Sequence, residues 1–417
     1  MNITQRFAKW ALAASMLGAS AAVPAQDITM ATWGGGVGKA WREAYAEPFM
    51  KASKLEVKIV EVPTPEAQVR AQKGAPKFNA VLSSLFEAAQ MYEDGLLEDF
   101  DMADFPALKN VPDKYLLKAP NGRLIGVSTY FAYYGIAVNT DLAKPADFAS
   151  WKNLADPKWA GKLSVTRPVY SSAYDLTIMS VAEGGSERDT AKGLELLTAL
   201  GKNALTMYSS MAQMNQLLQR GEVAAAPYYS TRIWQMQRDG QRNVELVVPK
   251  EGALMLPYLV VVPKGAQGRE HYMKWLEYVG QPEGQQRIAE IAGYMPLNSQ
   301  ARLSPAAEKE LGQPLDKLRD QLYQPDWNLI AKTRKTRIEA VERAMAGAAR
   351  AGRFSMRPSA QGMAVLTITS LSMRRPKSQA ASGGAPWRRR AASTRSWARS
   401  ASPARHGSKV GESMRPL

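Results

Sequence analysis

A strand, a glycine-rich turn, a helix and a second strand follow one another near the start of this 417-residue chain. The first strand ends at Trp33, the turn is Gly34-Gly-Gly-Val-Gly38, and the helix is expected to end near Lys51. Residues 55–62 read as the second strand. Strands and helices continue to alternate along the chain, which predicts α/β architecture with mostly parallel sheets.

An export leader precedes this unit. Residues 1–10 carry Arg6 and Lys9, residues 11–23 are small and mostly apolar, and Ala25 ends a small-residue cleavage pattern. An apolar run of about 13 residues is too short to anchor the chain in a bilayer. Cleavage near Ala25 and release of a mature periplasmic protein are therefore expected.

The formal net charge of +16 at pH 7 suggests a nucleic-acid-binding protein, but the charge is unevenly distributed. Residues 350–417 hold 14 lysines and arginines against one acid, Glu412, so the body of the chain is close to neutral. No global field therefore attracts the body to nucleic acid or to an anionic membrane. Residues 374–417 of this tail lack apolar periodicity, which predicts disorder, and their composition resembles that of GC-rich DNA translated in a wrong frame.

Residue types that most hydrolases need are scarce. The chain has no cysteine and only two histidines, His271 and His406. Thiolate catalysis, zinc–thiolate sites and disulfides are thereby excluded, and no Ser-His-Asp set has support from spacing. The sequence therefore predicts neither an enzyme nor a cofactor.

The Gly34–Gly38 turn and Lys39 invite comparison with a phosphate-binding loop. The glycine spacing is too short for that loop, and Ala40 stands where a magnesium-binding Ser or Thr is required. Two interpretations stay open: a turn of purely geometric function, and a turn whose backbone N–H groups contact a ligand.

Two extended segments, residues 134–139 and 256–262, stand where the chain could cross between two lobes. Open α/β sheets bind ligands beyond the carboxyl ends of their strands. Aromatic and hydroxyl side chains are expected at such ends, where they can clamp and orient a small solute. The candidate ligand-binding residues are Trp33, Gly34, Ser83, Ser84, Tyr130, Tyr134, Arg167, Tyr170, Tyr228, Tyr229, Arg232 and Tyr258.

Several motifs occur in the order found in one protein family. They are Ala31-Thr-Trp-Gly-Gly35, Pro48-Phe49, Tyr134-Gly-Ile-Ala-Val-Asn139, Trp151-Lys-Asn-Leu-Ala-Asp-Pro-Lys-Trp-Ala-Gly-Lys-Leu163, Gly221-Glu-Val-Ala224 and Gly293-Tyr-Met-Pro296. With them the chain, from residue 1 to about 346, resembles the spermidine/putrescine-type periplasmic binding proteins of ABC importers. The resemblance implies a two-lobe type II periplasmic binding protein fold with a two-strand hinge and a ligand cleft between the lobes.

The same resemblance implies partners and an organisation along the chain. Closure around one solute would be read by an inner-membrane permease with its ATP-binding subunit. We expect a monomer that has no nucleic-acid partner. The expected parts are a signal peptide at 1–25, lobe 1 at 26–137 and 256–300, lobe 2 at 138–255, C-terminal helices on lobe 2 at 301–349, and the basic tail at 350–417.

Individual residues carry over unevenly from the family. Trp33 matches an aromatic residue that stacks on the ligand, and Ser83 or Ser84 matches a pocket hydroxyl. Tyr228 or Tyr229 stands near a pocket tryptophan.

The acidic residues that hold polyamine ammonium groups are not at the matching places. Arg167-Pro-Val-Tyr-Ser171 replaces an acid-rich segment, and Tyr258 follows Pro257 where an aspartate is expected. A cation would be desolvated there without a partner. The sequence therefore predicts an anionic group on the solute, bound by Arg167 with Arg232 as a second contact. The alternative for Arg167 is an ion pair with Asp175 that faces solvent.

Two other functions stay open. A related binding-protein family holds ferric ion with a Tyr-Tyr pair after a strand, and Tyr228-Tyr229 resembles that pair. The second alternative is nucleic-acid or membrane binding through the basic tail.

Overall fold

The computed structural model describes residues 27–350, with the side chains described up to residue 347. The predicted signal peptide and residues 351–417 of the predicted tail lie outside the described residues. Among the described residues, no helix is both long enough and apolar enough to cross a membrane.

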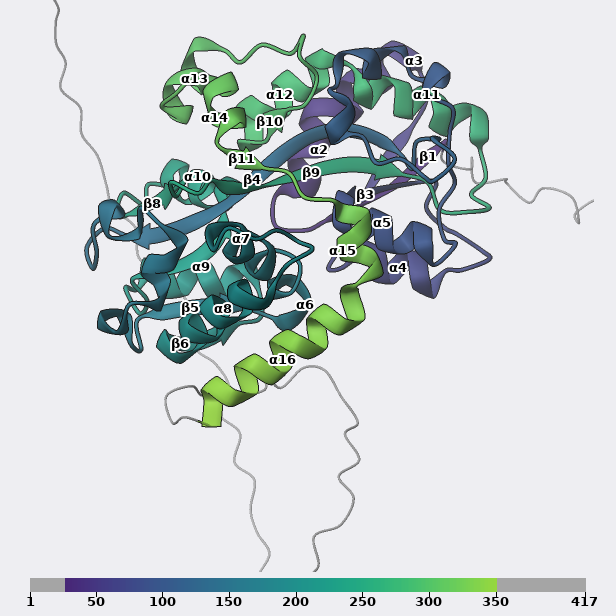
Figure 1. The fold of residues 1–417 in the computed structure, drawn as a ribbon. Helices are drawn as coiled ribbons and strands as arrows, with labels where there is room; N and C mark the ends of the chain where they lie inside the picture. Colours follow the sequence, from purple (N-terminus) through teal and green to yellow (C-terminus); the bar gives the residue numbers. More distant parts are fainter. Residues whose placement is uncertain (1–26, 351–417) are drawn as a thin grey trace, which may run out of the picture. The chain divides into compact units, whose positions relative to one another are not determined.

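A single hydrogen-bonded network of strands runs through both lobes, in the order β2-β1-β3-β9-β4-β7-β5-β6 (Figure 1). The two central strands, β9 and β4, are long and pair with each other in antiparallel orientation. The short strands β8, β10 and β11 pair with these central strands outside the main path. The strands are β1 (Ile28–Trp33), β2 (Val57–Val62), β3 (Ala80–Ser84), β4 (Val127–Asn139), β5 (Leu163–Thr166), β6 (Ala204–Tyr208), β7 (Ala225–Tyr229), β8 (Val244–Val247), β9 (Ala253–Val261), β10 (Met295–Pro296) and β11 (Leu322–Tyr323).

Strand β4 changes partners along its length. Its first part, Val127–Tyr134, pairs with β9, and its second part, Tyr134–Asn139, pairs with β7 and β8. Tyr134 therefore marks the point where the chain passes from one lobe to the other. The pairings of β4 with its neighbours and of β3 with β9 are antiparallel. The expectation of mostly parallel sheets therefore holds for the outer strands and for the short β11 on β9.

Helices cover both faces of the network (Figure 1). On lobe 1, α11 and α12 cover one face and α4 and α5 cover the other. The helices are α2 (Val37–Trp41), α3 (Glu47–Ser53), α4 (Pro65–Ala71), α5 (Leu85–Glu93), α6 (Pro168–Ser171), α7 (Asp175–Ala182), α8 (Ala191–Asn203), α9 (Met211–Gln219), α10 (Ser230–Arg238), α11 (Arg269–Gly280), α12 (Pro282–Ala292), α13 (Pro305–Leu311), α14 (Leu315–Asp320), α15 (Trp327–Lys332) and α16 (Arg334–Arg350).

The first helical segment is continuous but irregular. A π-helical turn, η1 (Arg42–Ala46), joins α2 to α3. Pro48 lacks the N–H that would bond to the Ala44 carbonyl four residues earlier. The Ala44 carbonyl oxygen instead accepts from Arg287 Nε of α12 at 2.6 Å. The proline thus frees a backbone acceptor that fixes α12 to the first helical segment.

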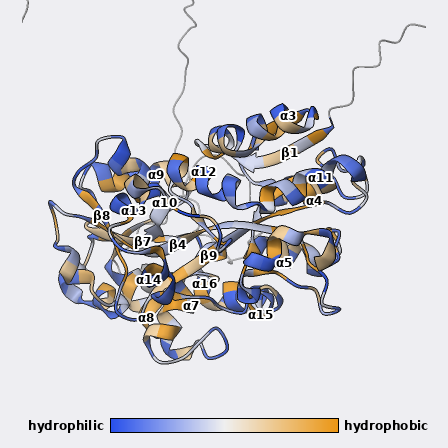
Figure 2. Cartoon of the chain, turned by 90° about the horizontal axis from the view of Figure 1, so that it is seen from above, coloured by the Kyte–Doolittle hydropathy of each residue, from blue (hydrophilic) through white to orange (hydrophobic). Residues whose placement is uncertain are grey.

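The hydrophobic core has one cluster on the α11–α12 face of lobe 1, one on the α9–α10 face of lobe 2, and one that is continuous under both lobes. Figure 2 shows hydrophobic residues along β9, whereas helices such as α13 alternate hydrophobic and hydrophilic residues. The continuous cluster includes Phe86 of lobe 1 together with Tyr174 of lobe 2 and Trp327 of α15. The two lobes are therefore in direct apolar contact on the α5–α7 side.

The C-terminal helices divide between the lobes, which differs from their predicted place on lobe 2. Leu303, Ala307 and Leu318 are buried in the lobe 1 core, and α15 packs on α5 of lobe 1. The last helix, α16, packs on lobe 2, against α8 and α6 (Figure 1). Sequence order alone misplaces these helices, because β11 pairs with β9 and leads the chain back across the hinge.

Candidate functional site

Aromatic side chains from three strands of lobe 1 gather near the hinge. The ring of Tyr258 on β9 lies 5.7 Å from that of Trp33 on β1 and 5.5 Å from that of Tyr130 on β4. The Tyr294 ring, just after α12, lies 4.4 Å from the Tyr130 ring. Trp33 and Tyr258 remain partly exposed, whereas Tyr130 is fully buried and its Oη accepts from Trp41 Nε1 at 2.7 Å. Trp33 and Tyr258 are thus the two members of this group that can reach a solute.

A second aromatic group belongs to lobe 2. Tyr174 contacts Tyr170, Tyr134 and Tyr229, with ring centroids between 5.6 and 6.3 Å apart. The Phe86 ring of α5 lies 6.1 Å from that of Tyr174 and connects the two lobes. Tyr170 and Tyr229 are partly exposed. Burial raises the pKa of Tyr170 to about 12, so its phenol stays protonated near neutral pH.

The end of β3 supplies a polar centre between these aromatic groups. Ser84 begins α5 with a capping box, in which Ser84 Oγ accepts from Glu87 N at 3.2 Å and donates to Glu87 Oε2 at 3.0 Å. Ser84 also pairs with Tyr258 in the β3–β9 ladder. Ser83 is only 1% exposed and donates to the Ser84 carbonyl, so its hydroxyl belongs to the core.

Glu87 is the residue that the sequence prediction missed. It is 5% exposed, and its negative charge contributes to raising the pKa of the Tyr170, Tyr174 and Tyr258 phenols. Burial, followed by repulsion from Glu66, raises the pKa of Glu87 to about 7. The sequence signal was present as Ser84-x-x-Glu87, which is a capping-box pattern and therefore reads as a local helix start.

A second buried carboxylate lies deeper, under β4. Asp175 Oδ1 accepts from Tyr134 Oη at 2.8 Å, and Asp175 Oδ2 has no hydrogen-bond partner among the described residues. Burial raises the pKa of Asp175 to about 7. Tyr134 is fully buried by this contact, so it is a structural residue of the hinge and not the ligand contact that was predicted.

Two arginines face the same region. Arg167, between β5 and α6, is exposed, and its guanidinium carbon lies 5.3 Å from the centroid of the Tyr170 ring. It makes no ion pair with Asp175, whose Oδ1 is bonded to Tyr134 instead. Arg232 of α10 donates from Nη1 to the Gly35 carbonyl at 3.3 Å, which connects lobe 2 to the glycine turn of lobe 1.

The glycine turn after Trp33 depends on backbone freedom. Gly35 and Gly36 have φ of 74° and 93°, values that strain residues with a side chain. This geometry leaves Gly34 partly exposed beside Trp33 and turns the Gly35 carbonyl toward Arg232. The structure thus gives the turn a geometric role.

Tyr228 and Tyr229 do not form a two-phenolate metal site. Tyr228 Oη lies 2.8 Å from Asn215 Oδ1 and 3.1 Å from the Met211 carbonyl of α9, whereas Tyr229 packs against Tyr134. The two rings are edge-to-face neighbours with centroids 5.8 Å apart, but Tyr228 Oη is already hydrogen-bonded to α9. Burial also raises the pKa of both phenols, which disfavours the phenolate that a ferric ion needs. Within residues 27–350, no group of three or more His, Cys, Asp or Glu could hold a metal ion.

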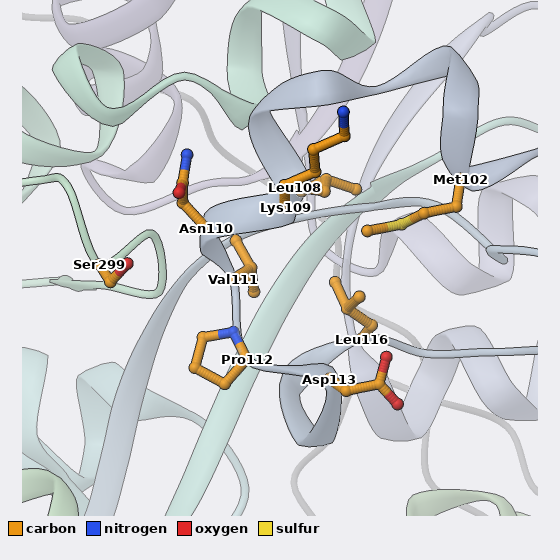
Figure 3. Close-up of a pocket in the computed structure, with 9 residues that line it drawn as sticks. All are labelled: Met102, Leu108, Lys109, Asn110, Val111, Pro112, Asp113, Leu116 and Ser299. Atoms are coloured by element: carbon orange, nitrogen blue, oxygen red, sulfur yellow. The ribbon is translucent and has the colours of Figure 1, made fainter.

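Neither of two surface cavities contains a predicted ligand-binding residue. A cavity of about 410 Å³ lies among the turns of residues 102–116, where the ends of Lys109 and Asp113 point to opposite sides (Figure 3). A cavity of about 180 Å³ lies between α10 and α13. The predicted residues that the structure does bring together between the lobes are Trp33, Gly34, Ser84, Arg167, Tyr170, Tyr229, Arg232 and Tyr258.

Residues 44–312 match the family described as bacterial extracellular solute-binding proteins. The chain belongs to this family. Among its relatives, the spermidine/putrescine-binding periplasmic protein 1 of Haemophilus influenzae is 22% identical, with 61% of this chain and 72% of that protein covered. The resemblance seen in the sequence is thereby confirmed.

Other solute-binding relatives are named for different solutes. A protein of Salmonella paratyphi A named for 2-aminoethylphosphonate binding is 24% identical, with 70% of this chain and 83% of that protein covered. The gamma-aminobutyric acid-binding protein of Pseudomonas aeruginosa is 25% identical at the same coverage. Membership of the solute-binding family therefore fixes the class of protein and leaves the solute open.

Solved structures of the same class share the fold. An ABC transporter substrate-binding protein from Bradyrhizobium japonicum has a TM-score of 0.63 at 19% identity, with 77% of this chain and 98% of that chain covered. The prediction of the two-lobe type II periplasmic binding protein fold is confirmed.

Proposed function

We propose that this solute-binding protein is the periplasmic component of an ABC importer and encloses one small organic solute that carries an anionic group. It binds the solute without transforming it, uses no cofactor, and delivers the solute to an inner-membrane permease with its ATP-binding subunit. The leader supports export with cleavage near Ala25, and we propose a monomer. Detection of a mature N-terminus at Gln26 by mass spectrometry would test the cleavage.

Arg167 carries the proposal of an anionic group. Its guanidinium is exposed, is held beside the Tyr170 ring, and has no carboxylate partner among the described residues. A guanidinium binds carboxylate or phosphonate with two parallel hydrogen bonds. Arg232 adds a second cation, since it donates to the Gly35 carbonyl and makes no ion pair with the described residues.

The names of the relatives agree with this assignment in part. Gamma-aminobutyric acid and 2-aminoethylphosphonate each carry an anionic group, whereas spermidine and putrescine do not. Because Arg167 stands where an acid-rich segment is expected in polyamine binders, the polyamines are the less favoured solutes here.

The test is isothermal titration of the exported protein with 4-aminobutyrate, 2-aminoethylphosphonate and putrescine. A charge-assisted hydrogen bond contributes about 1.5–3 kcal/mol, so R167A should weaken an anionic solute at least tenfold. The matched control is R220A, because Arg220 is an exposed arginine of lobe 2 whose one ion pair among the described residues is with Glu222, at 3.7 Å. Tight binding of putrescine that R167A leaves unchanged would overturn the proposal.

A further inference from the structure

Glu87 is a buried carboxylate with one committed oxygen. Oε2 serves the capping box through Ser84 N at 3.4 Å and Ser84 Oγ at 3.0 Å. No described residue donates a hydrogen bond to Oε1, and no ion pair within residues 27–350 includes Glu87. A capping box needs one acceptor, which a glutamine supplies equally well. Helix capping therefore does not explain why a carboxylate stands at this position.

Burial of an unpaired carboxylate is costly, so the free protein holds Glu87 in an unfavourable state. The charged groups around it do not relieve the cost. Glu66 of α4 repels it, and Arg334 at the start of α16 is the weakest of the contributions that stabilise its charge. The phenols of Tyr170, Tyr174 and Tyr258 are neutral at physiological pH because burial raises their pKa.

The surroundings of Glu87 favour a particular kind of partner. Ser84 pairs with Tyr258 across the ladder, and the neighbouring Phe86 contacts Tyr174. Aromatic rings beside one carboxylate suit an organic ammonium group, which gains from the ring faces as well as from the negative charge. A metal ion would need several carboxylates or histidines, and no such group exists within residues 27–350.

We propose that Glu87 Oε1 accepts a hydrogen bond from an ammonium group of the solute, which makes the solute a small zwitterion. The ammonium end lies at the start of α5, next to Tyr170 and Tyr258, and the anionic end reaches Arg167 or Arg232. This inference rests on the proposed function and adds the second charge of the solute.

Binding of an ammonium group beside Glu87 displaces a proton from its carboxyl group. The pKa of Glu87 is about 7 in the free protein, and a bound ammonium group lowers it. Binding at pH 7 therefore releases protons, and affinity for an amino solute rises as the pH increases from 6 to 8. A solute without an amino group releases no proton from Glu87.

The experiment compares 4-aminobutyrate with butyrate and 2-aminoethylphosphonate with ethylphosphonate by titration calorimetry. The unmodified protein should bind each amino compound at least tenfold more tightly than its partner. E87Q keeps the capping box and should remove that preference while the affinity for butyrate and ethylphosphonate is retained. D175N is the matched control, since Asp175 is also buried with a raised pKa but is bonded to Tyr134, and it should keep the preference.

The outcomes separate this inference from the proposed function. If the unmodified protein binds none of the four compounds, the proposed class of solute is wrong and the inference fails with it. Binding that depends on Arg167 but is equally tight with and without the amino group would overturn the role of Glu87 alone. Titration of the unmodified protein at pH 7 in buffers of different ionisation enthalpy measures proton release without any substitution, and no release would contradict the inference.

Discussion

The guanidinium carbon of Arg238 lies 3.9 Å from the ring centroid of Trp234, and both side chains donate to Glu310. Trp234 Nε1 is 3.1 Å from Glu310 Oε2, and Arg238 Nη2 is 2.8 Å from the same oxygen. Arg238 also donates to the Glu290 carbonyl of α12. Because α10 belongs to lobe 2 and α12 and α13 pack with the lobe 1 core, this contact connects the lobes outside the hinge strands.

Removal of Glu310 should favour separation of the lobes. The ion pair is about 40% exposed on both sides, so E310A should change the free energy of unfolding by less than about 1 kcal/mol. Loss of the Glu310 contact should nevertheless shift the equilibrium between closed and open lobes toward the open state, because this contact joins the two lobes directly. We expect a larger radius of gyration in solution scattering without solute. E308A, a change on the same helix at an exposed residue without an ion pair among the described residues, should leave the scattering unchanged; equal curves for both variants would contradict the prediction.

Substitution of Gly293 by alanine should lower the stability of the protein more than the same substitution of Gly312. Gly293 and Gly312 have φ of 68° and 74° and end helices α12 and α13. A Cβ on Gly293 would lie 2.7 Å from the Trp234 ring, whereas one on Gly312 would meet nothing within 4 Å.

Both substitutions carry the backbone strain of about 1 kcal/mol, and only G293A adds the clash. Urea denaturation should therefore find G293A less stable than G312A. Equal stability of the two variants would show that Trp234 moves aside at no cost.

The free energy of unfolding should fall as the pH rises, because Asp175 and Glu87 are buried carboxyl groups. Burial raises the pKa of each carboxyl to about 7, above its value in the unfolded chain, so the folded state binds more protons. Their stabilising contribution is complete below about pH 4 and is lost as the pH rises through about 7.

D175N should flatten this dependence and increase stability at pH 8 by an amount on the order of 1 kcal/mol or more. Tyr134 can still donate to the asparagine oxygen. Melting temperatures from pH 5 to 8 check this, with D320N at an exposed acid as the control. A D175N profile parallel to that of the unmodified protein would contradict the assignment.

Local sequence patterns identified the first strands and the two crossing segments. Features that depend on contacts between distant parts of the chain were not apparent from those patterns. The first strand ends at Trp33 as expected, the strand expected over residues 55–62 contains β2, and the crossings at residues 134–139 and 256–262 lie within or overlap β4 and β9. No turn signal marks the start of β6, because its five residues follow α8 directly.

The candidate site was predicted less well for the same reason. Aromatic residues at strand ends were identified, but their exposure depends on partners far away in the sequence. Tyr130 is bonded to Trp41 and Tyr134 to Asp175, contacts that no local pattern reveals. Glu87 was overlooked because its capping role is local, whereas its lack of a charged partner appears only when α4, α6 and β9 surround it.

A chain that ends at Ala349 should fold and bind its solute as the full chain does. Val341 and Met345 of α16 are buried against lobe 2, and Arg337 donates to the Ser172 carbonyl at 2.9 Å, so the contacts that hold α16 precede the truncation. From residue 374 onward the sequence is dominated by Arg, Ser, Ala, Gly and Pro and has no apolar periodicity from which a core could form. A chain that ends at Lys332 is the control, because it removes all three of these residues and should lower the melting temperature markedly. Weaker solute binding or a lower melting temperature in the chain that ends at Ala349 would show that the tail takes part in the fold or in transport.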